Sequence, residues 1–310
     1  MDAPGASLGL LGVPLAILGG AIRISTPFLF VSLGECITEK SGRINLGLEG
    51  ILVMGAMSAY GIALVSGSPW LGVLVAALVG LALGGLHAAI CQLPRVNDIA
   101  TGIGLMLFAT GLAFFLGKPL IQPKAPNLGA IDLGWWSEVP QVHQALQVNY
   151  LFLVGIALAF AMAWALRNTR WGLIVRLAGE SVDAALAMGV SVNLVRFVAT
   201  SIGGAFAGVG GAFLSLYYPG SWNEGLSSGQ GLMAVALVIF ARWEPVRCLW
   251  ASLLFGAAGA ISPALQSVGV TQGYYLFNAA PYVLTLALMI ATCSPERSLR
   301  GAPGELGAVH

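Results

Sequence analysis

Residues 70–93 read WLGVLVAALVGLALGGLHAAICQL, and no Asp, Glu, Lys or Arg interrupts them. An α-helix needs about 20 consecutive apolar residues to cross the hydrocarbon core of a bilayer. The stretch is long enough to do so. It therefore predicts a membrane-spanning helix, and similar stretches recur along the whole chain.

The composition of the 310-residue chain also requires a membrane. It is 57% hydrophobic and only 9% charged, whereas soluble domains are about 25% charged. A soluble fold has too little interior to hide so much apolar surface, but lipid can solvate it. The 14 Lys and Arg nearly balance the 13 Asp and Glu, so there is no basic field that would bind nucleic acid.

Nine apolar runs approach the spanning length. They are Leu8–Thr38, Leu46–Ser66, Trp70–Leu93, Asp98–Gly117, Asn149–Leu166, Leu194–Tyr218, Gly229–Ala241, Cys248–Gln266 and Phe277–Cys293. The first is long enough for two short helices broken near Pro27, which would make ten. The seventh is short enough to be a half-helix or a re-entrant segment. We therefore expect an all-α bundle of about nine to ten membrane segments, with residues 1–310 forming one domain.

The basic residues of the loops are distributed unequally. If the runs cross the membrane alternately, eleven of the 14 Lys and Arg fall on one side, and Lys118 and Lys124 fall on the other. By the positive-inside rule the richer side is cytoplasmic, which puts the C-terminus in the cytoplasm and predicts a bacterial inner-membrane protein. The cysteines fall near cytoplasmic ends of runs, where disulfides are not expected. They are Cys36, Cys91, Cys248 and Cys293.

Small residues recur at a spacing of four in two of the runs. Gly80 and Gly84 form one such pair, and Gly204 and Gly208 form another. This spacing lets membrane helices approach closely. We expect these pairs to pack within one chain rather than to dimerise two chains.

Motifs for enzymatic chemistry are missing from the sequence. There is no GxxxxGK[ST] loop to hold ATP phosphates, no cysteine spacing typical of a metal site, and His87 stands alone in an apolar run. Leu226–Gln230 reads LSSGQ, like the signature of ATP-binding-cassette ATPases, but the predicted topology makes it an external loop. We expect neither catalysis nor a cofactor in this chain.

The cytoplasmic loop of residues 167–196 is the most informative hydrophilic segment. Glu180–Met188 predicts a short helix with acidic residues at its start, and Gly189 fits a C-cap. Its exposed apolar residues favour a protein-binding surface. An interfacial helix resting on lipid headgroups explains the same pattern, and the residues alone do not decide between the two.

A family resemblance favours protein binding. Asp183-Ala184-Ala185-x3-Gly189 resembles the coupling loop of ATP-binding-cassette importer permeases, with Asp in place of Glu. The wider stretch Arg170–Gly189 resembles permeases of the branched-chain amino acid, ribose and nucleoside superfamily. The resemblance implies that this loop docks on an ATPase. The residues implied in coupling are Arg176, Glu180, Asp183, Ala184, Ala185 and Gly189.

Three further segments resemble the nucleoside and simple-sugar branch of that superfamily. They are SGRINLGLEG at 41–50, NDIATG at 97–102 and FARWEP at 240–245. Asp98, Ala241 and Glu244 depart from the usual residues, which bears on the substrate class and not on the fold. The resemblance implies a cytoplasmic ATPase, a second, similar but non-identical permease, and an extracytoplasmic substrate-binding protein as partners.

Polar residues near the ends of runs are candidates for the translocation pathway or its gate. They are Asn45, Glu49, Asp98, Thr101, Asn223 and Glu224. We expect the acids of runs two and four to pair with Arg43 and Arg95, and the nearby Asn and Thr to offer hydrogen bonds to a solute. Helix capping and interface anchoring explain these residues equally well. The pair at 223–224 either meets the substrate-delivery protein or makes a polar turn.

Two other functions can be weighed against the sequence pattern. An ion- or proton-coupled secondary transporter needs ionisable groups near the middle of the membrane, but Glu35, Glu49 and Asp98 fall near the ends of runs. A membrane scaffold or enzyme would not need the coupling-loop pattern. The solute stays open among nucleosides, nucleobases, riboflavin-like compounds and sugars.

Overall fold

Among the residues that the computed structural model describes, seven helices are long and apolar enough to cross a membrane. The structure describes residues 12–121, 123–137, 139–268, 277, 279–292 and 301–307. The seven helices are α1 (Val13–Lys40), α2 (Leu48–Ser66), α3 (Pro69–Cys91), α4 (Asp98–Gly117, prolonged by the 3₁₀ turn η2, Lys118–Leu120), α6 (Tyr150–Asn168), α9 (Val192–Leu216) and α11 (Pro245–Ser267).

The remaining elements are short. They are α5 (Pro140–Ala145), α7 (Arg170–Glu180), α8 (Val182–Ala187), α10 (Gln230–Phe240), α13 (Ala280–Thr292), α14 (Gly304–Gly307) and the antiparallel strands β1 (Ala130–Asp132) and β2 (Gln147–Asn149). The polytopic all-α class is confirmed, apart from these two strands in the loop after α4. The predicted nine to ten segments are not confirmed, and part of the ninth run, Phe277–Cys293, lies outside the described residues.

Side-chain caps set several of the helix starts. The Asn97 side chain accepts a hydrogen bond from the Ala100 N–H at the start of α4, and Asn149 does the same for the Leu151 N–H at the start of α6. Thr169 accepts from the Gly172 N–H at the start of α7. Each cap satisfies a donor that the first turn of a helix leaves unpaired.

The first apolar run forms one helix and not two in its described part. Pro27 lies inside α1 without ending it. The hydroxyls of Ser25 and Thr26 bond to the Ile22 carbonyl at 3.2 and 2.8 Å. Inside a membrane, where no water competes, such side-chain bonds and neighbouring helices let a helix continue past a proline.

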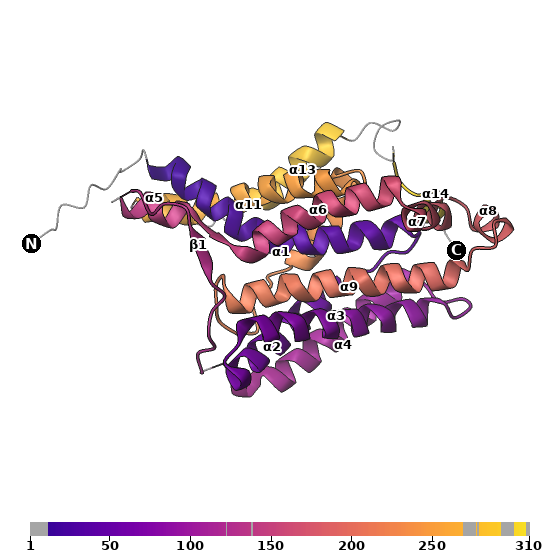
Figure 1. Ribbon diagram of the computed structural model, residues 1–310, viewed down its shortest axis with the longest axis horizontal. Helices are drawn as coiled ribbons and strands as arrows, with labels where there is room; N and C mark the ends of the chain where they lie inside the picture. The colour runs from indigo at the N-terminus through magenta and orange to yellow at the C-terminus, as the bar shows by residue number, and fades with distance from the viewer. Residues whose placement is uncertain are drawn as a thin grey trace, which may run out of the picture.

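Helix α9 is the central element of the bundle. It packs against α1, α2 and α3, while α11 packs along α1 on the other side (Figure 1). Gly204 faces Gly80 and Gly84, and Gly208 faces Gly80 and Ala76, so the backbones of α3 and α9 touch. The predicted packing of the two glycine pairs within one chain is confirmed, because each pair is the other's partner.

The bundle has two chemically different ends. We call the end that carries Lys40, Arg43, Arg95, the α7–α8 segment and the α10–α11 turn the basic end; α7, α8 and α14 mark it at the right of Figure 1. The opposite end carries β1 and α5. Arg43 pairs with Asp98 at the basic end, and Arg167 pairs with Glu244 there, so the predicted segregation of loops agrees with the fold.

Candidate functional site

Glu49 lies where the half-helix α10 begins. One carboxylate oxygen accepts hydrogen bonds from the Ser227 hydroxyl at 2.5 Å and the Gly229 N–H at 3.1 Å. The other accepts from the Gly231 N–H at 2.6 Å. These donors include first-turn groups of α10 that have no partner within the helix, and the helix dipole favours a negative charge there. Glu49 therefore caps α10 from a helix that lies far away in the sequence.

This contact corrects two expectations from the sequence. Glu49 pairs with neither Arg43 nor Arg95, and Leu226–Gln230 is not an external loop. The 11 residues of α10 span roughly 16 Å at 1.5 Å per residue, and its C-terminal end reaches the basic end, where Trp243 donates to Glu39. Its N-terminal end consequently lies about halfway along the bundle. The chain can place irregular backbone at that depth only where protein or a cavity surrounds it.

Glu49 itself lies well inside the bundle and not at a membrane entry. The neighbouring Gly50 packs on Met106, eight residues into α4, so that a methyl group at Gly50 would lie 2.8 Å from the Met106 Cα. Eight helical residues correspond to about 12 Å. The segment 41–47 therefore folds back into the bundle before α2 begins.

Asn45 holds this returning segment in place. Its backbone N–H donates to Glu35 at 2.8 Å, and its side-chain oxygen accepts from the Gly47 N–H at 3.0 Å. The side chain is fully buried within the chain. The side-chain nitrogen of Asn45 has no hydrogen-bond partner among the described residues, so the hydrogen bond from Asn45 to a solute stays a prediction.

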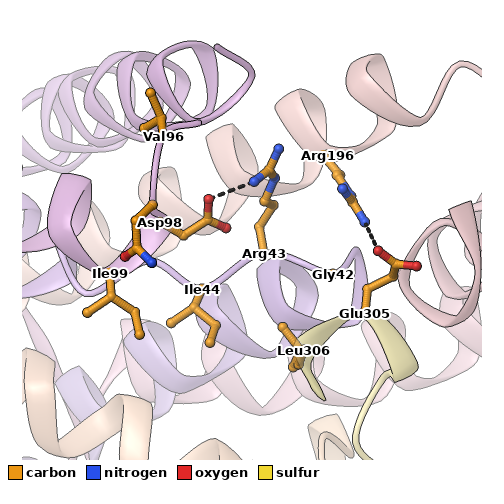
Figure 2. A pocket seen from close by; sticks show the side chains of 10 residues that line it. Gly42, Arg43, Ile44, Val96, Asp98, Ile99, Arg196, Glu305 and Leu306 are labelled. Carbon is orange, nitrogen blue, oxygen red and sulfur yellow. Dashed lines mark hydrogen bonds and ion pairs between the residues drawn. The ribbon is translucent and has the colours of Figure 1, made fainter. Parts of the chain in front are cut away.

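Asp98 makes one of the expected ion pairs. Its carboxylate lies 2.6 Å from Arg43 Nη1, so this pairing is confirmed. Figure 2 shows the pair on one side of a cavity of about 180 Å³ at the basic end, with Arg196 and Glu305 on the other side. Two cations and two carboxylates thus line one opening between α4, α9 and the C-terminal segment.

The other pathway candidates make local contacts. Thr101 donates to the Asn97 carbonyl at 2.9 Å, which is a bond within the first turn of α4. Asn223 accepts from the Gly225 N–H at 3.1 Å and is exposed, as is Glu224. The two exposed residues form a polar turn before the chain enters the bundle, which was one of the two interpretations.

The predicted helix Glu180–Met188 is divided in two. α7 ends at Glu180, Ser181 is extended, and its hydroxyl caps α8 by accepting from the Ala184 N–H at 3.3 Å. Serine competes for nearby backbone groups in this way and so favours a cap over a helix interior. Gly189 has a φ of +74°, so the predicted left-handed turn is confirmed.

The two faces of α8 differ. Ala185 is completely buried against Ala178 of α7 and Val192 of α9, which corrects the expectation that it is one of the exposed apolar residues of this helix. Asp183, Ala184, Ala187 and Gly189 are exposed, as are Leu186 and Met188, the last by 73%. Arg176 and Glu180 are exposed on α7. One face thus anchors α8 to the chain, and the other offers apolar surface beside charged groups.

The sequence alone suggested no functional role for Arg23, Arg196 or Glu305, but the structure places each of them beside a cavity. Arg23 lines a cavity of about 360 Å³ near the end opposite the basic end, together with Tyr218, Ser267 and small residues. A guanidinium so placed can donate hydrogen bonds to a polar solute. A lone cation in an apolar run was the signal for it. Arg196 and Glu305 had no such signal, because their contact joins distant parts of the chain.

Comparisons with known proteins define the family. Residues 16–293 match the model of the branched-chain amino acid transport system permease component. The chain belongs to this family. It is a permease subunit of an ATP-binding-cassette transporter and not itself an enzyme.

Similar curated proteins support the same assignment over most of their length. The permease is 34% identical to the putative glucose ABC transporter permease protein TsgC13 of Haloferax volcanii, over 82% of this chain and 79% of that protein. It is 30% identical to the nucleoside ABC transporter permease protein NupC of Lactococcus lactis, over 88% and 90%. It is 29% identical to the guanosine ABC transporter permease protein NupQ of Bacillus subtilis, over 87% and 89%.

Proposed function

We propose that this permease forms, with a second and similar permease, the membrane path of an importer for a nucleoside or a simple sugar. Residues 1–310 act as one domain. The basic end faces the cytoplasm of a bacterial inner membrane and receives an ATPase, and the opposite end receives an extracytoplasmic substrate-binding protein. The nucleoside and glucose permeases among its relatives support this range of solutes.

The proposal rests on the difference between the two faces of α8, one packed on the chain and the other exposed. A helix that only rests on lipid headgroups presents a continuous apolar face along its length. Here Ala185 is packed on the chain's own α7 and α9, while Leu186 and Met188 project on the other side with Asp183 beside them. A small, rigidly held knob of this kind fits a cleft in a partner protein.

The experiment replaces Met188 with Glu in the whole transporter expressed from its own gene cluster. A carboxylate buried without a partner in the ATPase contact weakens binding by about 2–5 kcal/mol. We expect normal membrane levels of the permease, loss of ATPase co-purification and loss of ATP-dependent uptake. Leu173→Glu is the matched control, since Leu173 is a similarly exposed apolar residue on α7.

Two results would contradict the proposal. One is full ATPase binding and uptake by Met188→Glu. The other is uptake by the unaltered transporter that collapses with an uncoupler while ATP is held constant, which would indicate an ion-coupled secondary transporter.

A further inference from the structure

The C-terminal residues 301–307, which we call the C-terminal clasp, lie far from α1 in sequence but pack against the basic end of the bundle. Ala302 and Leu306 contact its apolar core, and Pro303 is buried. A methyl group at Gly304 would lie 2.7 Å from the Glu180 carbonyl oxygen. The clasp therefore fits closely against the end of α7, at its junction with α8.

Glu305 connects the clasp to two separate elements. One carboxylate oxygen accepts a hydrogen bond from the backbone N–H of Val182, the first residue of α8, at 3.3 Å. The other lies 3.3 Å from Arg196 Nη2, near the start of α9. The side chains of Glu305 and Arg196 are only 18% and 11% exposed, so solvent screens this pair less than a surface pair.

Arg196 extends the connection to α1 and α7. Its Nε donates to the Ser41 carbonyl at 3.0 Å, and its Nη2 donates to the Ala178 carbonyl at 3.3 Å. Ser41 follows α1 and begins the segment that ends at the α2 helix carrying Glu49. A single guanidinium thus joins α7, the clasp and the segment that returns into the bundle.

The cavity in Figure 2 separates this group from the Arg43–Asp98 pair. Gly42 lies between the two pairs, and a methyl group there would lie 2.9 Å from Arg196 and 3.1 Å from the Glu305 Cβ. We call residues 41–47 the α1–α2 segment. While Glu305 and Arg196 stay joined, a movement of α8 therefore also moves this segment. The cavity of about 180 Å³ gives Arg43 and Asp98 room to respond.

We propose that the clasp transmits force from α8 to the α1–α2 segment, with Glu305 and Arg196 as positioning residues for energy coupling. The inference rests on the proposed function, since it needs an ATPase that moves α8. Loss of the Glu305 contacts with Val182 and Arg196 leaves α8 able to bind the ATPase through the exposed face of α8. The same loss uncouples ATP hydrolysis from solute movement.

The test uses Glu305→Ala and Glu305→Gln in the complete transporter reconstituted in lipid vesicles. Gln keeps the shape and an oxygen for the Val182 N–H but loses the charge that faces Arg196. For Glu305→Ala we expect an unchanged membrane level, unchanged ATPase co-purification and continued ATP hydrolysis, with uptake reduced by roughly 5- to 150-fold, the range of a typical coupling between sites. The ATP consumed per solute rises accordingly, and Gln gives an intermediate value.

Glu244→Gln is the matched control. It breaks ion pairs with Arg167 and Arg247 at the same end of the bundle, but those side chains are largely exposed, and exposed pairs contribute little. We expect its ATP consumed per solute to equal that of the unaltered transporter.

The outcomes separate the two proposals. Equal coupling in Glu305→Ala, Glu305→Gln and the unaltered transporter would overturn the clasp and leave the proposed function intact. Loss of ATPase binding by Glu305→Gln would overturn it too, because the clasp would then serve docking. An unaltered transporter that shows no ATP-dependent uptake would remove the basis of both proposals.

Discussion

Three buried carboxylates of this permease each hold a segment of irregular backbone. Glu35 accepts from the Asn45 N–H, Glu39 accepts from the Trp243 indole, and Glu49 caps α10. All three are at most 9% exposed. Buried acids in a membrane protein usually indicate a functional site, but here each has a donor from the chain. Their first role is to fix loops inside the bundle, which removes the need to invoke ion coupling for them.

Glu49, which accepts from three donors, gives a prediction for Glu49→Gln. The amide oxygen can still accept from Ser227 and Gly229, but the NH₂ group faces the Gly231 N–H and leaves that donor unpaired. An unsatisfied buried donor costs about 1–3 kcal/mol. We expect a lower thermal unfolding midpoint for the purified permease, with the α10 end more accessible to thiol reagents at a cysteine placed at Leu226, which is buried in the unaltered chain.

Glu224→Gln serves as the control for this change, since Glu224 is exposed. It should leave the unfolding midpoint unaltered. If Glu49→Gln unfolds at the same temperature as the unaltered permease, then the capping role assigned to Glu49 is wrong.

At the scale of elements, the contact between α3 and α9 depends on the absence of side chains. Lipid tails are as apolar as the helices, so close backbone packing must hold them together. A methyl group at Gly204 would lie 2.9 Å from the Gly84 Cα, which is too close for a real side chain. Glycine pairs with this spacing form dimer contacts in other membrane proteins. Here both pairs pack against each other within one chain.

Gly204→Ala and Gly111→Ala are expected to change stability in opposite directions. The first inserts a methyl group between two backbones, and such overpacking costs about 1–3 kcal/mol. The second adds a methyl group where nothing lies within 4 Å, so the better helix propensity of Ala gains about 0.5–1 kcal/mol. Thermal unfolding of both variants in the same detergent measures the two changes in stability. A stabilised Gly204→Ala would refute the close backbone contact between α3 and α9.

At the scale of the whole molecule, local information predicted the elements well. The run Asp98–Gly117 coincides with α4, and Leu46–Ser66 differs from α2 by two residues at its start, because length, hydropathy and caps act within a few residues of each boundary. Contacts such as Glu49 with Gly231 or Arg196 with Glu305 join residues more than a hundred positions apart. Neither periodicity nor spacing predicts which distant residues meet. The capping of α10 by Glu49 and the contacts of the C-terminal clasp are therefore visible only in the structure.

The last prediction concerns the orientation of the whole bundle. Asp183 and Lys124 are both exposed. Asp183 lies on α8 and Lys124 lies in the loop between η2 and β1, and Figure 1 shows α8 and β1 at opposite ends of the helices. Arg167, Arg170, Arg176 and Arg247 gather at the end that carries Asp183, and a basic loop is retained in the cytoplasm. A cysteine at Asp183 should therefore react with a membrane-impermeant maleimide only in inside-out vesicles. A cysteine at Lys124 should react only in spheroplasts, whose inner membrane is closed and right side out.

The native thiols interfere little with this measurement. Cys36, Cys91 and Cys248 are buried, and Cys293, which lies outside the described residues, is changed to Ser in the background. Because the ATPase needs cytoplasmic ATP, the sidedness of Asp183 also decides whether α8 can meet it. Labelling of the Asp183 cysteine from outside intact cells would place α8 away from any ATPase and would refute the proposed importer together with its orientation.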